Sequence, residues 1–239
     1  MYFFNRNQMF LALTLLTTTL LLACRKNAEE VVEMLSNTEA AEIMESAVAS
    51  RSAGATMPAE EMAKMLEADL GDCGTPGDTS FQRSSTAGPV NYNYLFNLDW
   101  LINCNNAGIP QGAQVGVAGN GTFNTQRWSG NDVTTGALVF TGLNPQATAY
   151  TVNGSYTLDG GLTGNLRNID PSLNVEITVN LTDLTIRKSD RFITGGTGTV
   201  VLVATNARGR TETVNGALVF NGDGTATVTV NGFSYTFPL

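Results

Sequence analysis

The sequence contains no histidine among its 239 residues. Without histidine, catalysis by an imidazole base is excluded, and the commonest zinc-ligand sets are excluded as well. Positive charge is also scarce, because 13 Lys and Arg residues stand against 21 Asp and Glu residues. An acidic chain without a basic cluster argues against nucleic-acid binding. We therefore expect no metal site, no cofactor and no nucleic-acid partner.

A phosphate-binding glycine loop that opens a helix is also missing. Paired carboxylates could still hydrolyse glycosides. The acids that could serve in such a pair are Asp99, Asp170, Glu176, Asp183 and Asp190. Nothing in their spacing singles out two of them, and solvated surface acids are the simpler interpretation. We expect no catalytic residue and keep a carboxylate-based hydrolase as the least favoured alternative.

Near the N-terminus, Met9–Leu22 is an uncharged run rich in Leu and Thr, preceded by a single base, Arg6. A weakly positive start, a short apolar core and small residues at a cleavage site are the features of a signal peptide. The run is shorter than the roughly 20 apolar residues that a comfortable membrane span needs. A retained anchor of borderline length is the alternative.

The residues Leu21-Leu22-Ala23-Cys24 resemble the lipobox of bacterial lipoproteins. The resemblance covers only the first two dozen residues, and it implies cleavage after Ala23 and lipidation of Cys24. More than one acyl chain is enough for stable anchoring. The resemblance therefore predicts a signal peptide at 1–23, a tether at 24–35 and an exported protein held in the membrane by its lipid. The outer membrane, on its periplasmic or its surface face, is the expected location.

Only two further cysteines follow, Cys73 and Cys104. An exported chain enters an oxidising compartment, so these two residues are expected to form a disulfide. Two unpaired thiols are the alternative.

Residues 36–72 have the pattern of an acidic helical arm. Ser36 and Glu39 have the spacing of a capping box, and the apolar residues behind them recur at helical intervals up to Val48. A turn is expected at 51–56, and Pro58 suits the first turn of a second helix. The arm must bury its apolar faces, because helices of this length are marginal alone.

Residues 73–89 are rich in Gly, Ser, Thr and Asp and are expected to form a linker. From residue 90 onward the pattern alternates with period two, which is typical of strands. One face of the first strand is strongly aromatic and is most simply a core face. As an alternative, it could provide a sugar-stacking surface, for which the residues would be Tyr92, Tyr94, Trp100 and Trp128.

The predicted fold is mainly β: an antiparallel meander at 90–239, either a sandwich or a curled sheet, preceded by the arm. Asn-Gly pairs favour hairpin turns, and they occur at 120–121, 153–154, 215–216, 221–222 and 231–232. The pentapeptide GALVF occurs at both 136–140 and 216–220. This repetition predicts two tandem units, at about 80–160 and 161–239.

These features favour a non-catalytic binding or structural lipoprotein that contacts a glycan, the matrix or an envelope protein. The alternative is a periplasmic carrier that holds an apolar ligand between curved β layers. The identity of the ligand and the oligomeric state do not follow from the sequence.

Overall fold

A computed structural model of the chain describes residues 34–68, 73–86, 90–166 and 171–239. The chain divides into two units, Met1–Met34 and Leu35–Leu239. The predicted signal peptide, Cys24 and most of the tether lie outside the described residues.

Two helices form the arm, as predicted. Helix α2 (Asn37–Val48) begins at the capping box: Ser36 Oγ accepts a hydrogen bond from the Glu39 backbone N–H, and Glu39 Oε2 accepts one from the Ser36 N–H. A short 3-10 turn, η1 (Ser50–Ser52), leads to helix α3 (Thr56–Ala68). The apolar faces of both helices are buried, so tertiary packing stabilises helices that would be marginal alone.

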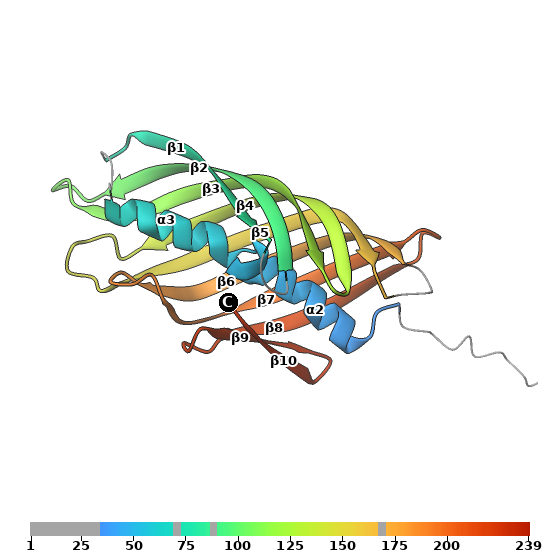
Figure 1. Cartoon of the computed structure of the whole chain (residues 1–239). Coiled ribbons are helices and arrows are strands. Elements are labelled where there is room, and N and C mark those ends of the chain that lie inside the picture. The colour runs from blue at the N-terminus through green and yellow to red at the C-terminus, as the bar shows by residue number, and fades with distance from the viewer. Residues whose placement is uncertain (1–33, 69–72, 87–89, 167–170) are drawn as a thin grey trace, which may run out of the picture. The chain divides into compact units, whose positions relative to one another are not determined.

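Ten strands follow the arm. Their bounds are β1 (Pro76–Ser85), β2 (Val90–Cys104), β3 (Pro110–Thr125), β4 (Trp128–Thr141), β5 (Ala149–Gly164), β6 (Ser172–Arg187), β7 (Ile193–Asn206), β8 (Thr211–Phe220), β9 (Thr225–Val230) and β10 (Phe233–Pro238). They form one sheet in sequence order, and every neighbouring pair is antiparallel (Figure 1). The sheet does not close, since β1 and β10 are its two edges. The predicted antiparallel meander is confirmed, and of the two architectures the curled sheet is the one formed.

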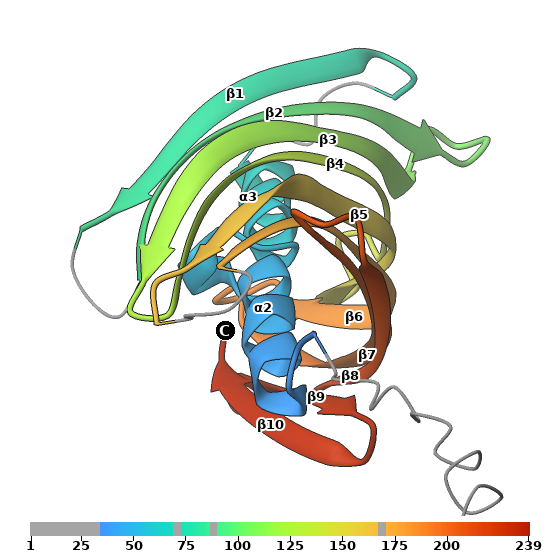
Figure 2. The same cartoon turned by 90° about the vertical axis from the view of Figure 1, so that its right-hand side faces the viewer.

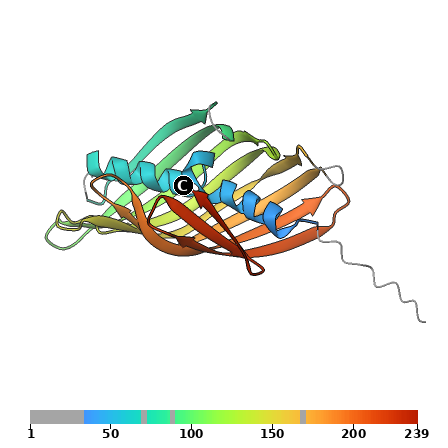
Figure 3. The ribbon, with the colours of Figure 1, turned by 60° about the horizontal axis from the view of Figure 1, so that its bottom comes forward.

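The sheet curls around the arm, which lies on its concave face (Figure 2). Helix α2 contacts strands β6 to β10, whereas η1 and α3 contact β2. Both helices cross the strands obliquely (Figure 3). The core is therefore a single layer, formed by the apolar faces of the arm helices and the inward-facing side chains of the strands. These side chains include Phe96, Phe140 and Phe237.

The predicted linker at 73–89 is wrong over most of its length, because Pro76–Ser85 form strand β1. This strand pairs with β2 along ten residues, from Pro76 opposite Leu101 to Ser85 opposite Tyr92. Its polar composition suits an edge strand, and proline is tolerated at the first position of such a strand. Phe81 holds it in place by stacking on the Phe96 ring, 5.2 Å between centroids.

Three of the five predicted Asn-Gly turns are also wrong, because the pairs at 120–121, 153–154 and 215–216 lie inside strands β3, β5 and β8. The pairs at 221–222 and 231–232 do lie in the turns that flank β9. Long strands with partners on both sides outweigh the local turn preference of two residues. The predicted boundary between the two tandem units, at 160–161, lies inside β5.

Candidate functional site

A cleft of 310 Å³ opens between the arm, the β3–β4 turn and edge strand β10. Helix α2 and η1 form one wall, the β3–β4 turn forms another, and Tyr235 on edge strand β10 completes it. Its charged and aromatic residues are Glu42, Glu45, Arg51, Phe123, Arg127, Trp128 and Tyr235. The cleft thus combines side chains from segments that are far apart in the sequence.

The β3–β4 turn presents two of these side chains. Thr125 Oγ1 accepts hydrogen bonds from the backbone N–H groups of Arg127 (3.2 Å) and Trp128 (2.8 Å), and it donates one to the Trp128 carbonyl (3.0 Å). These hydrogen bonds fix the conformation of the β3–β4 turn, which contains only two residues between the strands. As a result, Arg127 points toward α2, and its Nε lies 3.6 Å from Glu42 Oε1.

Glu42 and Glu45 lie three residues apart in α2, a spacing that places both carboxylates on one side of the helix. Glu45 forms an ion pair with Arg51 and accepts a 2.9 Å hydrogen bond from the Tyr235 hydroxyl. The two carboxylates therefore connect α2 to the β3–β4 turn on one side and to edge strand β10 on the other. The contacts of Arg127 with Glu42 and of Tyr235 with Glu45 thus hold the arm against the sheet at the cleft.

Burial shifts the ionisation of this cluster. It raises the pKa of the Glu42 carboxyl, while the positive charge of Arg127 opposes that rise. Burial, followed by the hydrogen bond to Glu45, raises the pKa of Tyr235 to about 12. The Tyr235 phenol is therefore protonated near neutral pH and donates to Glu45.

Comparison with protein-family models, with curated proteins and with solved structures gives no match.

The four aromatic residues considered as an alternative ligand surface differ in their exposure. Tyr94 and Trp128 are buried, with 2% and 4% of their surface exposed, whereas Tyr92 and Trp100 are half-buried. Tyr94 stacks on Phe96 at 5.8 Å, inside the core. The stripe on β2 is thus a core face, and of the four residues only Trp128 lines the cleft.

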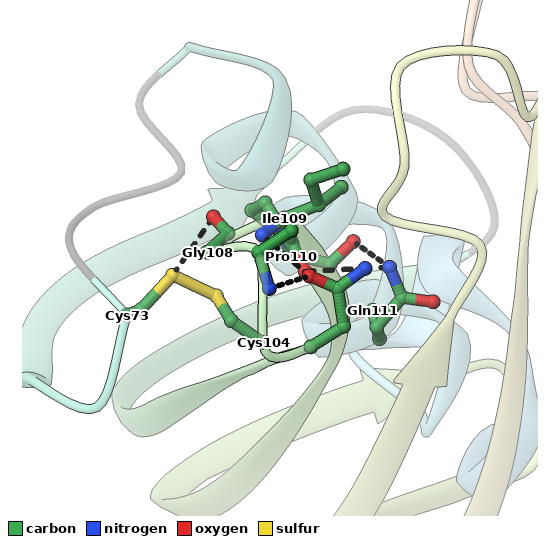
Figure 4. Close-up of a disulfide and its surroundings, with 8 residues drawn as sticks. Cys73, Cys104, Gly108, Ile109, Pro110 and Gln111 are labelled. Atoms are coloured by element: carbon green, nitrogen blue, oxygen red, sulfur yellow. Dashed lines mark hydrogen bonds between the residues drawn. A yellow bond between two sulfur atoms is a disulfide. The ribbon is translucent and has the colours of Figure 1, made fainter.

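The predicted cysteine pair forms a disulfide, with 5.8 Å between the two Cα atoms (Figure 4). The bond joins Cys73, just before β1, to Cys104 at the end of β2. Cys73 Sγ also lies 3.4 Å from the Gly108 carbonyl oxygen in the β2–β3 loop. Asn105 shapes that loop, because its Oδ1 accepts hydrogen bonds from the N–H groups of Ala107 and Ile109. The role visible in the structure is a covalent tie near the end of the arm.

The acids considered for glycoside hydrolysis do not converge. Asp99 on β2 and Glu176 on β6 lie four strands apart, about 19 Å at the usual spacing. Glu176 and Asp183 lie seven residues apart on β6, about 23 Å along the strand. Asp190 forms an ion pair with Arg187, and Asp170 lies outside the described residues. The two catalytic carboxyl groups of a glycosidase lie about 5–9.5 Å apart. These acids therefore do not form such a pair.

Within the described residues there is no group of three metal-ligating side chains, and no helix there is both long and apolar enough to cross a membrane.

Sequence reasoning missed five of the cleft residues, namely Glu42, Glu45, Arg51, Arg127 and Tyr235. The one signal available was the spacing of the two glutamates in a predicted helix. Arg127 follows its partner Glu42 by 85 residues, and Tyr235 follows its partner Glu45 by 190 residues. No local sequence pattern connects residues so far apart.

Proposed function

We propose that this chain is an exported lipoprotein, anchored through Cys24, that binds an envelope component without chemical turnover. The lipobox supports the anchor. The cleft between Glu42 on the arm and Arg127 on the sheet supports the binding role. A glycan or another envelope component is the proposed partner, and the outer membrane is the proposed location.

The cleft is the observation that carries the binding role. Pockets for small ligands begin at about 300 Å³ and combine apolar walls with a few well-placed polar groups. This cleft has that volume, an aromatic wall and hydrogen-bonding groups held by ion pairs. Its side chains are braced before any ligand arrives, and such preorganisation favours binding.

Retention on insoluble cell-wall polysaccharide tests the binding role. We expect the purified full-length chain to be retained, and we expect Glu42→Gln to reduce retention. Glu60→Gln is the matched control, because Glu60 is another partly buried glutamate on the arm, in a separate hollow next to Asp190. Equal retention of all three proteins, or none of the unsubstituted chain, would contradict the role of the cleft.

Fractionation tests the anchor. The unsubstituted chain should accompany the membranes of an expressing bacterium, and Cys24→Ala should appear in the soluble fraction. Protease digestion of intact and of permeabilised cells then distinguishes the surface face from the periplasmic face. Membrane retention of Cys24→Ala would reject the lipid anchor.

The carrier of an apolar ligand remains a second hypothesis, since the concave face of the sheet is apolar. That face is already covered by the arm, which buries Ile43, Met44, Val48, Met62 and Leu66. Burial of one such side chain stabilises by about 1.5–3 kcal/mol. Together these five approach the whole net stability of a typical domain, about 5–15 kcal/mol. Displacing the arm to admit a ligand would therefore remove much of the free energy that stabilises the folded state.

A further inference from the structure

The charges in the cleft are balanced. Glu45 is paired with Arg51 and Glu42 faces Arg127, so two acids meet two bases. An ionic ligand would bring an uncompensated charge into a partly buried cluster whose charges already balance, and burial of a charge without a partner is costly. The electrostatics of the cleft therefore favour a neutral ligand over an anion or a cation.

The polar groups of the cleft are a mixture of donors and acceptors. Carboxylates only accept hydrogen bonds and guanidinium groups only donate them. The side chains of Glu42, Arg51 and Arg127 are 21%, 31% and 51% exposed, so each retains accessible surface. A hydroxyl group both donates and accepts. A ligand with several hydroxyl groups can therefore bind carboxylate and guanidinium at once.

The remaining wall is apolar and is formed by Ile43, Val90, Phe123, Trp128 and Leu162. A ligand that fits the whole cleft must therefore present apolar C–H groups on one side and hydroxyl groups on the other. A sugar ring has this distribution. The volume of 310 Å³ limits the ligand to a short saccharide.

We propose that the cleft between Glu42 and Arg127 binds a short neutral saccharide. This inference rests on the proposed binding function and assigns the chemical class of its ligand. Glu42 accepts hydrogen bonds from the sugar hydroxyl groups, Arg127 donates to them, and the ring lies against the wall that contains Trp128.

Fluorescence of Trp128 provides the test. The chain has two tryptophans, and Trp100→Phe in the full-length protein leaves Trp128 as the only indole. This variant is titrated with galactose, maltose and N,N′-diacetylchitobiose as neutral probes, and with glucuronic acid and glucosamine as charged probes. We expect a saturable change with at least one neutral probe and binding at least tenfold weaker for both charged ones.

In the same background, Glu42→Gln should weaken binding of the neutral probe about tenfold or more, because it removes a charged acceptor. Glu60→Gln should leave binding unchanged. Equal binding by all three proteins would overturn the assignment of the cleft. Tighter binding of a charged probe would overturn the neutral class.

The two proposals can fail separately. If polysaccharide retention depends on Glu42 but none of the neutral probes binds, the short-saccharide assignment fails and the binding function stands. If neither retention nor probe binding depends on Glu42, both proposals fail.

Discussion

The Tyr94 hydroxyl donates a 2.5 Å hydrogen bond to Asp132 Oδ2 inside the protein core. Asp132 is 4% exposed, and its Oδ1 has no hydrogen-bond partner among the described residues. Gly121 and Gly160 lie opposite it on the two neighbouring strands, so neither neighbour offers a side-chain group. An ionised carboxylate at this position has one partner for two oxygens, and burial of such a charge is unfavourable.

We expect Asp132 to make stability depend on pH. Burial raises its pKa to about 6, although the hydrogen bond from Tyr94 acts in the opposite direction. The folded state then binds the proton more tightly than the unfolded state, whose pKa is about 3.9. The free energy of unfolding should therefore fall as pH rises from about 4 to about 6, by roughly 3 kcal/mol from this group. Urea unfolding across this range measures the change.

Asp132→Asn supplies the control, because an amide keeps an acceptor for Tyr94 and does not titrate. Its free energy of unfolding should lack the decrease between pH 4 and 6. At pH 7 this variant should be more stable than the unsubstituted protein. An unchanged pH profile in Asp132→Asn would assign the dependence to other groups.

The joint between the two arm helices should tolerate no added methyl group at Gly54. A Cβ there would lie 2.6 Å from the backbone carbonyl carbons of Ala47 and Val48, which cannot move independently of α2. Overpacking of this kind costs about 1–3 kcal/mol. Gly54→Ala should lower the free energy of unfolding by that amount. Gly195→Ala is the matched control, because a Cβ there meets nothing within 4 Å and should leave stability unchanged or slightly higher.

The helical arm could be predicted from the sequence because its signals are local. The capping box of Ser36 and Glu39 and the apolar spacing behind it involve neighbouring residues only. The structure confirms the cap and buries the predicted face. The disulfide could also be predicted, since the predicted lipidation of Cys24 leaves two cysteines and a single possible pairing.

Strand β1 and the length of the other strands could not be predicted, because pairing across the sheet decides them. Residues 76–85 have a turn-like composition, yet β2 supplies partners along their whole length. Asn153 favours a turn, but in the structure its Oδ1 accepts a hydrogen bond from the Asp183 N–H on the neighbouring strand. The cleft could not be predicted for the same reason, because Glu45 and Tyr235 are brought together only by the curled sheet.

Loss of the disulfide should destabilise the protein through the unfolded state. The bond closes a loop between residues 31 positions apart. The chain-entropy model assigns about 3–4 kcal/mol to a loop of this size. The double variant Cys73→Ser with Cys104→Ser should lower the free energy of unfolding by that amount in urea. An equally stable variant would show that the unfolded chain gains no freedom when the bond is absent.

Two acids face each other on the exposed side of the sheet, where Asp159 on β5 is the direct neighbour of Glu176 on β6. Like charges at directly opposed positions destabilise a sheet, and opposite charges contribute roughly 0.2–1 kcal/mol. Glu176→Lys should therefore raise the free energy of unfolding by about that amount at low salt. Because both side chains are exposed, about 1 M salt should remove most of the gain.

Glu176→Gln separates the two contributions, since it removes the repulsion without adding an attraction. The free energy of unfolding of Glu176→Gln should lie between that of the unsubstituted protein and that of Glu176→Lys. Adding Asp159→Asn to Glu176→Lys should abolish the salt-dependent part of the gain, because the new lysine then has no carboxylate opposite. If the gain persists in that double variant, it comes from the strand preference of the new side chain and not from the charge pair. If Glu176→Lys gives no gain at low salt, the repulsion between the two acids is already screened by water.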